Sequence, residues 1–245
     1  MMMPEVMKMK ARQWAMVQPT DGYGQSAVKW SCPVLKAAWP DVELAAEQSP
    51  ALGRTDAGST VQALSGSKPE GNFDITFGPD VTNLVGQRNT RGLVEGRSVV
   101  SVLTGEPKYP DPLGDETPTG WMVAGYPVGQ VQIPVCRTFG AADRARFREA
   151  PKMRSVVGRT TIKSIEAIIK RSGGLETAQL EAGFRGAALD SPAAYRASDR
   201  QGTLGSFVSR LAVKDGGGLM TGWRYCDGFN VQPDDAEMRR LRPAA

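Results

Sequence analysis

Residues 73–78 read FDITFG and residues 97–103 read RSVVSVL, and these are the strand-like runs of a chain of 245 residues. Turn-forming segments surround them, such as SGSKPEGN before the first run and TGEPKYPDPLGDETPTG after the second. Because Gly tolerates positive φ and Pro fixes φ, such segments predict turns and extended chain. Neither run is long enough to organise a large core.

The composition favours a thin core. Apolar residues make up 40% of the chain, against roughly 45–50% in an average soluble domain. The chain contains 28 Gly and 17 Pro, which predicts much loop. The formal net charge is +4, with a pI near 9.0, which favours acidic partners. No apolar run reaches the roughly 18 residues of a membrane span, and MMMPEVMKMK lacks the apolar core of a secretory signal.

The residues that are absent exclude most enzyme chemistry. The chain has no His, which excludes Ser-His-Asp and Cys-His catalysis and His-ligated metals. The three cysteines are too far apart for CxxC spacing, and no GxxxxGK[ST] loop occurs. Paired carboxylates remain conceivable, but Asp111, Asp115 and Glu116 lie in a loop without an evident constraint. The sequence therefore predicts neither an enzyme nor a metal site.

Two regions are expected, 1–130 and 131–245. The first is loop-rich and extended, with a short helix near residues 41–48. The second is mainly helical. Its expected helices are residues 140–150, residues 160–171, a helical pair within 191–218, and a last helix that starts at Pro233 and Asp234 with Glu237 in a capping box.

The resulting fold class is mainly α with extensive irregular loops: short helices joined by Gly/Pro-rich extended segments, with few short strands and a small core. Within the expected helix 160–171, isoleucines recur at helical spacing, at Ile162, Ile165, Ile168 and Ile169. We interpret this stripe as core rather than as a docking surface.

Each cysteine has aromatic or basic neighbours, in VKWSCPVLK, IPVCRTF and WRYCDGF. A thiol that tethers a flat, carboxylated cofactor needs aromatic faces for stacking and cations for its carboxylates, and adjacent cations favour the reactive thiolate. The alternative is that the cysteines are small buried hydrophobes. On the first interpretation, the predicted cofactor-binding residues are Cys226, Cys136, Cys32, Asp227, Arg137, Trp223 and Tyr225.

The segment CDGF…DDAEMRR resembles the cysteine segments of red-algal phycoerythrin γ subunits, the bilin-bearing linkers of phycobilisome rods. The match covers residues 226–229, residues 235–237, Arg239 and Arg240, while CRTFGAADRARFREA at Cys136 is a looser match. Cys32 departs furthest, because Pro33 follows it.

This resemblance implies a linker that threads phycobiliprotein rings and carries covalently attached bilin, phycoerythrobilin or phycourobilin, for light harvesting and energy transfer. Its partners would be phycobiliprotein α/β hexamers and other phycobilisome linkers. It would lie in the chloroplast, at the stromal face of the thylakoid membrane, without membrane insertion. Arginines would pair with carboxylates of the ring cavity: Arg144, Arg146, Arg148, Arg239 and Arg240.

Two other functions are consistent with parts of the sequence. Gly-rich loops and few enzymatic residues also suit a structural protein of a virus particle, such as a tail or head-completion subunit, with incidental cysteines. The basic segments RARFR and RRLR suggest nucleic-acid binding as a further function. Acids interleave with these cations, however, whereas phosphate binding favours a stripe of one sign. We therefore expect no nucleic-acid partner.

Overall fold

The computed structural model describes residues 1–189 and 193–241 and divides into two compact units. We call residues 2–127 and 208–224 the sheet unit. The helical unit contains residue 1 and the segments 128–207 and 225–245. The chain therefore passes from one unit to the other near residues 127, 207 and 224, and each unit is described by itself. The expected division at residue 130 stays a prediction.

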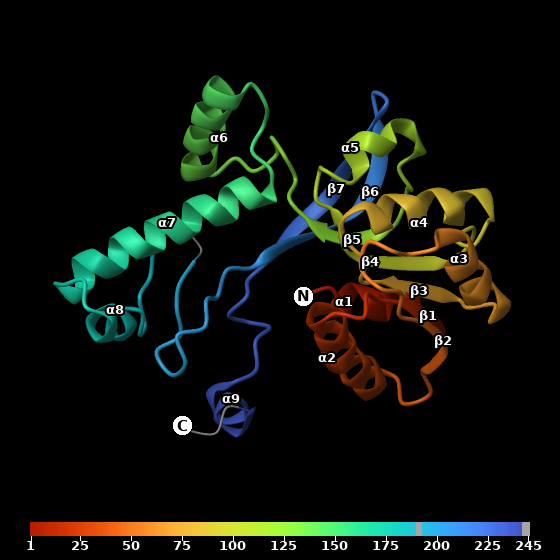
Figure 1. Cartoon of the computed structure of the whole chain (residues 1–245), viewed down its shortest axis with the longest axis horizontal. Coiled ribbons are helices and arrows are strands. Elements are labelled where there is room, and N and C mark those ends of the chain that lie inside the picture. The colour runs from red at the N-terminus through yellow and green to blue at the C-terminus, as the bar shows by residue number, and fades with distance from the viewer. Residues whose placement is uncertain (190–192, 242–245) are drawn as a thin grey trace. The chain divides into compact units, whose positions relative to one another are not determined.

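The secondary structure alternates between strands and helices over the first half of the chain (Figure 1). The strands are β1 (Gln13–Val17), β2 (Glu43–Gln48), β3 (Gly71–Asp74), β4 (Ser98–Gly105), β5 (Met122–Gly125), β6 (Ser206–Lys214) and β7 (Gly217–Cys226). The helices are α1 (Met3–Val6), α2 (Gly22–Ala38), α3 (Ala57–Gly66), α4 (Pro79–Thr90), α5 (Pro110–Leu113), α6 (Pro134–Phe147), α7 (Met153–Ser172), α8 (Thr177–Gly183) and α9 (Asp235–Leu241), with 3-10 turns η1 (Met7–Met9) and η2 (Gly114–Glu116).

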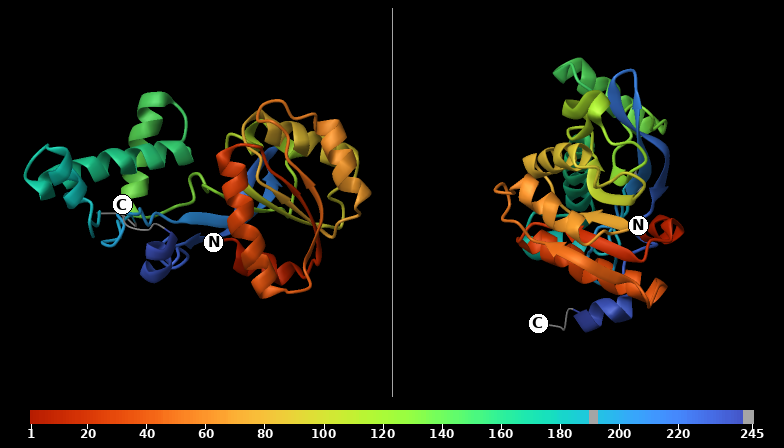
Figure 2. Two further views of the ribbon diagram at one scale, coloured as in Figure 1. Left: turned by 60° about the horizontal axis from the view of Figure 1, so that its bottom comes forward. Right: turned by 90° about the vertical axis from the view of Figure 1, so that its right-hand side faces the viewer.

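The described strands form one sheet of order β2-β1-β3-β4-β5-β6-β7. Neighbours from β2 to β5 pair in parallel, with Val17 opposite Asp74 and Asp74 opposite Ser101. Parallel neighbours need a crossover connection, and α2, α3 and α4 supply three of them. The left view of Figure 2 shows the sheet between α2 on one side and α3 with α4 on the other.

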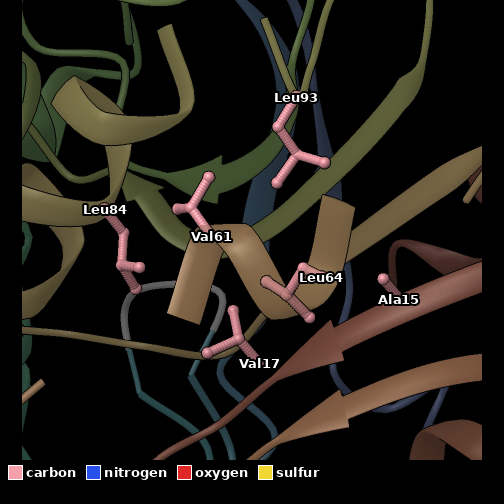
Figure 3. Packing of buried hydrophobic residues seen from close by; sticks show 6 residues of the cluster. All are labelled: Ala15, Val17, Val61, Leu64, Leu84 and Leu93. Carbon is pink, nitrogen blue, oxygen red and sulfur yellow. The ribbon is translucent and has the colours of Figure 1, made fainter. Parts of the chain in front are cut away.

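Burial on both faces explains the composition of the central strands. Trp14 to Val17 of β1 and all four residues of β3 are buried, as expected of parallel strands with helices on both sides. On the face of α3 and α4 the core cluster is drawn in Figure 3: Ala15, Val17, Val61, Leu64, Leu84 and Leu93. These side chains come from β1, α3, α4 and the turn after α4, so the cluster fixes the two helices on the sheet.

Two close contacts require glycine in the sheet. A Cβ on Gly71 would lie 2.7 Å from the Trp14 ring, so the indole packs flat over this backbone. A Cβ on Gly125 would lie 2.0 Å from the carbonyl carbon of Gly105, where the β4–β5 register shifts. The glycines of β3, β4 and β5 therefore serve packing rather than loop formation.

The strands β6 and β7 form a hairpin. Their two-residue turn is Asp215-Gly216, with φ values of 52° and 75°. A type I′ turn needs positive φ at both central residues, and its twist matches that of the flanking strands. The hairpin continues the sheet beyond β5, where the amide of Leu211 donates to the carbonyl of Trp121 at 3.0 Å.

In the helical unit, α7 packs against α8 through one side only. Ile168 is 1% exposed and meets Gly183 of α8, where a Cβ would lie 2.9 Å from the Ile168 side chain. The Tyr195 hydroxyl donates to Ser164 Oγ at 2.7 Å on the same side of α7. Ile162, in contrast, is 66% exposed.

These contacts correct the expectation that the whole isoleucine stripe is core. Ile168 is core, whereas Ile162, Ile165 and Ile169 are exposed. No helix in the described ranges is both long enough and apolar enough to cross a membrane.

The predicted fold class is wrong. The chain is a mixed α/β protein with a seven-stranded sheet, not a mainly helical one with few strands. Residues 43–48 form strand β2 where a helix is expected, because pairing with β1 overrides the helix propensity of Glu, Leu and Ala. Residues 206–218 form most of the β6–β7 hairpin rather than half of a helical pair. Residues 190–192 of that expected pair lie outside the described residues.

Several predicted elements are confirmed. β3 and β4 overlap the runs FDITFG and RSVVSVL. Helices α6 and α7 cover most of residues 140–150 and all of 160–171, and α7 ends at Gly173 in the left-handed region. Asp234 caps α9, where its Oδ1 accepts the amide of Glu237 at 2.8 Å.

The two environments of the α7 isoleucines give a matched test. We expect Ile168→Ala to lower the free energy of unfolding by about 2–5 kcal/mol, because it opens a cavity against α8. Ile162→Ala should change it by less than about 0.5 kcal/mol, because that side chain is already exposed. Urea titration followed by circular dichroism measures both variants. Equal losses would show that Ile162 is buried in solution.

Candidate functional site

The carboxyl ends of the parallel strands form the best defined polar edge of the sheet unit. In open α/β sheets, ligands bind outside these ends, at the point where the strand order reverses. Here the order reverses between β1 and β3, because the chain runs from β1 outward to β2 and then returns to β3 on the other side. The segments that follow β1, β3 and β4 therefore define the candidate site.

A buried ion pair fixes the end of β3. The Asp74 carboxylate accepts hydrogen bonds from the Thr76 amide at 2.8 Å and the Thr76 hydroxyl at 2.6 Å, and its other oxygen accepts from Arg88 Nη1 of α4. Both charged side chains are 0% exposed. The guanidinium also lies over the Trp121 ring, 5.7 Å from its centroid. The turn after β3 is therefore tied to α4 and to the start of β5.

Aromatic side chains line the same edge. Tyr23, in the first turn of α2, and Phe77, after β3, meet edge to face with ring centroids 5.5 Å apart. The Tyr109 hydroxyl accepts the Gly78 amide at 3.1 Å. The Lys108 ammonium lies 4.6 Å from the centroid of the Tyr109 ring. The edge thus combines an apolar wall with a fixed hydroxyl.

Tyr23 ionises less readily than a free tyrosine. Although the residue is 42% exposed, partial desolvation of its hydroxyl raises its pKa to about 12, and the nearby Tyr109, Asp74 and Asp21 contribute further. Tyr23 is therefore a neutral hydrogen-bonding group at physiological pH.

The end of β4 adds buried polar groups. Ser101 and Thr104 hydroxyls lie 2.5 Å apart and are both fully buried. Glu106, which follows β4, is 1% exposed. A buried polar side chain destabilises the fold unless it forms hydrogen bonds. Polar groups buried at this strand end therefore indicate a role other than packing of the core.

The helices that begin at this edge differ in capping. Asp21 caps α2, because its Oδ1 accepts the Gly24 amide at 2.8 Å. The N-cap of α4 is Gly78, with φ of 66° and no side-chain capping bond. A Cβ at Gly78 would meet nothing within 4 Å, so the space beside this N-cap is open. The first turn of α4 has no side-chain cap, so the amides that follow Pro79 and the positive end of the helix dipole lie at this edge, which suits an anion.

Two other cavities lie away from this edge. A cavity of about 700 Å³ lies at the amino ends of β4 and β5, lined among others by Asn89, Arg97, Glu116, Trp121 and Arg210. A cavity of about 320 Å³ lies along α7 in the helical unit. No cluster of three or more metal-ligating side chains occurs among residues 1–189 and 193–241.

The sequence-predicted site residues fall into three groups along the chain. Cys32 lies in α2, while Cys136 and the exposed Arg137 lie in α6. Trp223, Tyr225 and Cys226 lie in β7, and Asp227 follows it. The three cysteines thus belong to three different elements, and each remaining predicted residue lies close in sequence to one of them.

Local packing accounts for the motif CDGF. The Cys226 thiol is buried and donates to the Met1 carbonyl at 3.7 Å. Asp227 accepts the Phe229 amide at 2.9 Å and so forms the turn after β7. A Cβ at Gly228 would lie 2.5 Å from the Thr203 carbonyl oxygen, so this position needs glycine for close packing. Each motif residue before Phe229 has a structural role without a pigment.

The environment of two thiols disfavours the thiolate. Burial raises the pKa of Cys32 above its ordinary value, and the nearby Glu47 carboxylate adds to this effect. Burial likewise raises the pKa of Cys136. Tyr225, next to Cys226, is engaged internally: its hydroxyl accepts the Gly205 amide at 2.8 Å, and its ring packs on Phe207. At both thiols burial outweighs a nearby cation that lowers the pKa, Lys36 at Cys32 and Arg159 at Cys136, and the expected activation by Arg137 and Arg224 stays a prediction.

Comparison with known proteins identifies the family. Residues 2–217 match the model of the Periplasmic binding protein family. This match covers most of the chain, and the parallel sheet with its polar carboxyl edge agrees with it. The chain belongs to the Periplasmic binding protein family. No protein of curated function matches the sequence.

Solved structures of binding proteins share the fold. An amino acid ABC transporter substrate-binding protein from Pseudomonas fluorescens Pf-5 is 17% identical with a TM-score of 0.80, covering 96% of this chain and 64% of that one. A solute binding protein from Rhodopseudomonas palustris HaA2, solved with p-hydroxybenzoic acid, is 17% identical with a TM-score of 0.81, covering 97% and 65%.

A leucine-, isoleucine-, valine-, threonine- and alanine-binding protein from Brucella ovis is 13% identical with a TM-score of 0.73, covering 95% and 62%. The chain thus spans 62–65% of the length of these three structures.

The family overturns the resemblance to phycoerythrin γ subunits. The predictions of a phycobilisome linker, of covalent bilin and of a role in photosynthesis are wrong, because the similar structures are solute-binding proteins of ABC transporters. The predicted partners, phycobiliprotein hexamers and other linkers, and the predicted chloroplast thylakoid location are wrong for the same reason. The alternative of a virus structural protein has no support either.

The prediction that the chain is not an enzyme is confirmed, because the family binds solutes for transport rather than transforming them. Whether any of the seven residues predicted from the cysteine segments contacts another kind of ligand stays a prediction.

The edge residues were missed by sequence reasoning, although a signal exists. Asp74, Thr76, Phe77 and Gly78 follow directly from the strand-like run FDITFG. A polar residue and a glycine at the carboxyl end of a strand, followed by a helix that starts with Pro79, mark a strand-to-helix turn of the kind that binds ligands.

The buried ion pair predicts a large and specific stability effect. Arg88→Met should lower the free energy of unfolding by about 3–5 kcal/mol, because it leaves the Asp74 carboxylate buried without its cation. Arg91→Met, in the next turn and exposed, is the matched control and should change it by less than about 0.5 kcal/mol. Guanidinium titration measures both. Similar values for the two variants would contradict the burial of the pair.

The raised thiol pKa values predict slow alkylation. In a variant with Cys226→Ser, iodoacetamide should modify Cys32 and Cys136 more slowly than N-acetylcysteine at pH 7.5, because less thiolate is present when the pKa is raised. The rates should keep rising with pH after the small thiol has levelled off. Mass spectrometry of both sites over pH 7–10.5 checks this. Rates above those of the small thiol at pH 7.5 would contradict it.

Proposed function

We propose that this chain binds a small organic carboxylate at the carboxyl edge of the sheet unit, as the solute-binding component of a transport system. Membership of the Periplasmic binding protein family carries the proposal. The geometry supports it, because the polar and aromatic side chains of the sheet unit concentrate where its parallel strands end.

The carboxylate is favoured by the amino end of α4. Its N-cap Gly78 provides no side-chain cap, so backbone amides of the first turn are available to an anion. The acidic groups nearby are engaged within the protein: Asp74 pairs with Arg88, and Asp21 caps α2. The aromatic pair Tyr23 and Phe77 supplies an apolar wall for the body of the ligand.

Two kinds of carboxylate are consistent with this arrangement. The Rhodopseudomonas palustris HaA2 structure contains p-hydroxybenzoic acid, and the Brucella ovis protein is a binding protein for apolar and small amino acids. The edge-to-face contact of Tyr23 with Phe77 favours the aromatic acid, because a flat ring extends such a contact.

The same proposal includes the transport partner and the cellular compartment of this chain. A solute-binding protein of this family would deliver its ligand to the permease of an ABC transporter and would work in the bacterial periplasm.

Phe77→Ala tests the binding edge. Titration calorimetry with 4-hydroxybenzoate, benzoate and leucine should show saturable binding of at least one carboxylate by the unmodified chain. Phe77→Ala should weaken that binding by about tenfold or more, because it removes an aromatic contact of roughly 1.5 kcal/mol or more. Phe229→Ala, at a largely exposed phenylalanine of the helical unit, is the matched control and should bind as the unmodified chain does.

Two results would overturn the proposal. One is the absence of saturable binding for all three carboxylates in a folded preparation. The other is an equal loss of affinity in the Phe77 and Phe229 variants, which would place the ligand elsewhere than at the carboxyl edge.

A further inference from the structure

Positive charge is scarce at the carboxyl edge of the sheet unit. The segments that follow β1, β3 and β4 at this edge are residues 18–24, 75–80 and 106–110. Together they contain one cation, Lys108, and three acids, which are Asp21, Asp80 and Glu106. Like charges repel most strongly where water is partly excluded. An anionic ligand at this edge therefore needs a cation that offsets the acids.

Two other sources of positive charge at this edge are engaged or only partial. The Arg88 guanidinium belongs to the pair with Asp74, in which both side chains are 0% exposed. The amino end of α4 carries roughly half a positive charge. Asp80 lies in the first turn of that helix and offsets part of it. Neither source supplies the full charge that a carboxylate ligand requires.

Lys108 lies close to the proposed binding residues. Its ammonium is over the Tyr109 ring, 4.6 Å from the centroid. The hydroxyl of that ring accepts the Gly78 amide at 3.1 Å, so the ring extends from the lysine toward the N-cap of α4. Tyr109 is also near Tyr23, because it contributes, after desolvation of the Tyr23 hydroxyl, to the raised pKa of Tyr23. The lysine therefore lies at the same edge as the aromatic wall.

The surroundings of Lys108 leave its charge available to a ligand. The residue is half-buried, whereas the Tyr109 beneath it is 4% exposed. Among residues 1–189 and 193–241, no carboxylate forms an ion pair with the Lys108 ammonium. A cation over an aromatic face keeps its N–H donors for other partners. The ammonium is thus held in place without being neutralised.

Given the proposed function, on which this inference rests, we propose that Lys108 is the counter-ion of the ligand carboxylate. It makes the site selective for acids over their neutral analogues. The ammonium donates charge-assisted hydrogen bonds to the carboxylate, together with the first-turn amides of α4. The Tyr109 ring positions the lysine, so little side-chain freedom is lost when the ligand binds.

The test uses two probes of similar size that differ in charge, 4-hydroxybenzoate and 4-hydroxybenzamide. Each is titrated by calorimetry into the full chain. We expect the unmodified chain to bind the acid at least about tenfold more tightly, because the amide forms no charge-assisted bond with an ammonium. Lys108→Met should weaken binding of the acid by about tenfold or more and binding of the amide by less than about twofold.

Two further variants separate charge from packing. Lys108→Arg keeps the positive charge and the contact with an aromatic face, so it should retain the affinity for 4-hydroxybenzoate within about threefold. Lys36→Met removes an exposed cation in the last turn of α2, away from the carboxyl edge, and should bind both probes as the unmodified chain does. Urea titration checks that each variant is folded.

Three outcomes would overturn the inference. One is equal weakening of both probes by Lys108→Met, which would show that the lysine only supports Tyr109. Another is unchanged binding of 4-hydroxybenzoate by that variant, and the third is no binding of this acid by the unmodified chain. The proposed function is overturned by these titrations when benzoate and leucine also fail to bind, so the two failures are distinguishable.

Discussion

The buried pair of Asp74 and Arg88 is the interaction on which the polar edge depends. Removing two charges from water is costly, and only close mutual contact with further hydrogen bonds offsets the cost. The Thr76 amide and hydroxyl supply those bonds, so the β3 turn adopts the conformation that satisfies the carboxylate. Because Arg88 lies in the last turn of α4, the same pair ties that end of the helix to the turn after β3.

Three acidic side chains of the sheet unit position the backbone. Asp74 holds a turn, Asp21 caps a helix, and Asp80 accepts the Gly53 amide at 2.8 Å. A binding edge built in this way offers backbone amides and hydroxyls to a ligand, while its acids stay internal. That arrangement reconciles an edge rich in carboxylates with the proposal that the ligand is itself an anion.

The sequence predicted local features better than their assembly. β3, β4, α7 and the cap of α9 carry strong local signals and were identified, whereas β2 has a helix-like composition that only pairing with β1 corrects. The Asp-Gly pair at 215–216 is a strong hairpin signal, but it lies within residues 191–218, which were expected to form a helical pair. The carboxyl edge was missed because its residues are scattered in sequence and meet only through the parallel topology. The cysteines were predicted to bind a cofactor because each has aromatic or basic neighbours in sequence, although the structure packs them as ordinary buried or half-buried thiols.

The interleaved course of the chain has a consequence for synthesis. The sheet unit needs residues 208–224 to extend its sheet, and the helical unit takes up residues 225–241. An emerging polypeptide could form β1 to β5 early, but neither unit acquires all of its described parts until the ribosome has passed residue 224. Until β6 has emerged, the hydrogen-bonding edge of β5 that pairs with it stays uncovered, and a chaperone that shields strand edges during translation would find its substrate there.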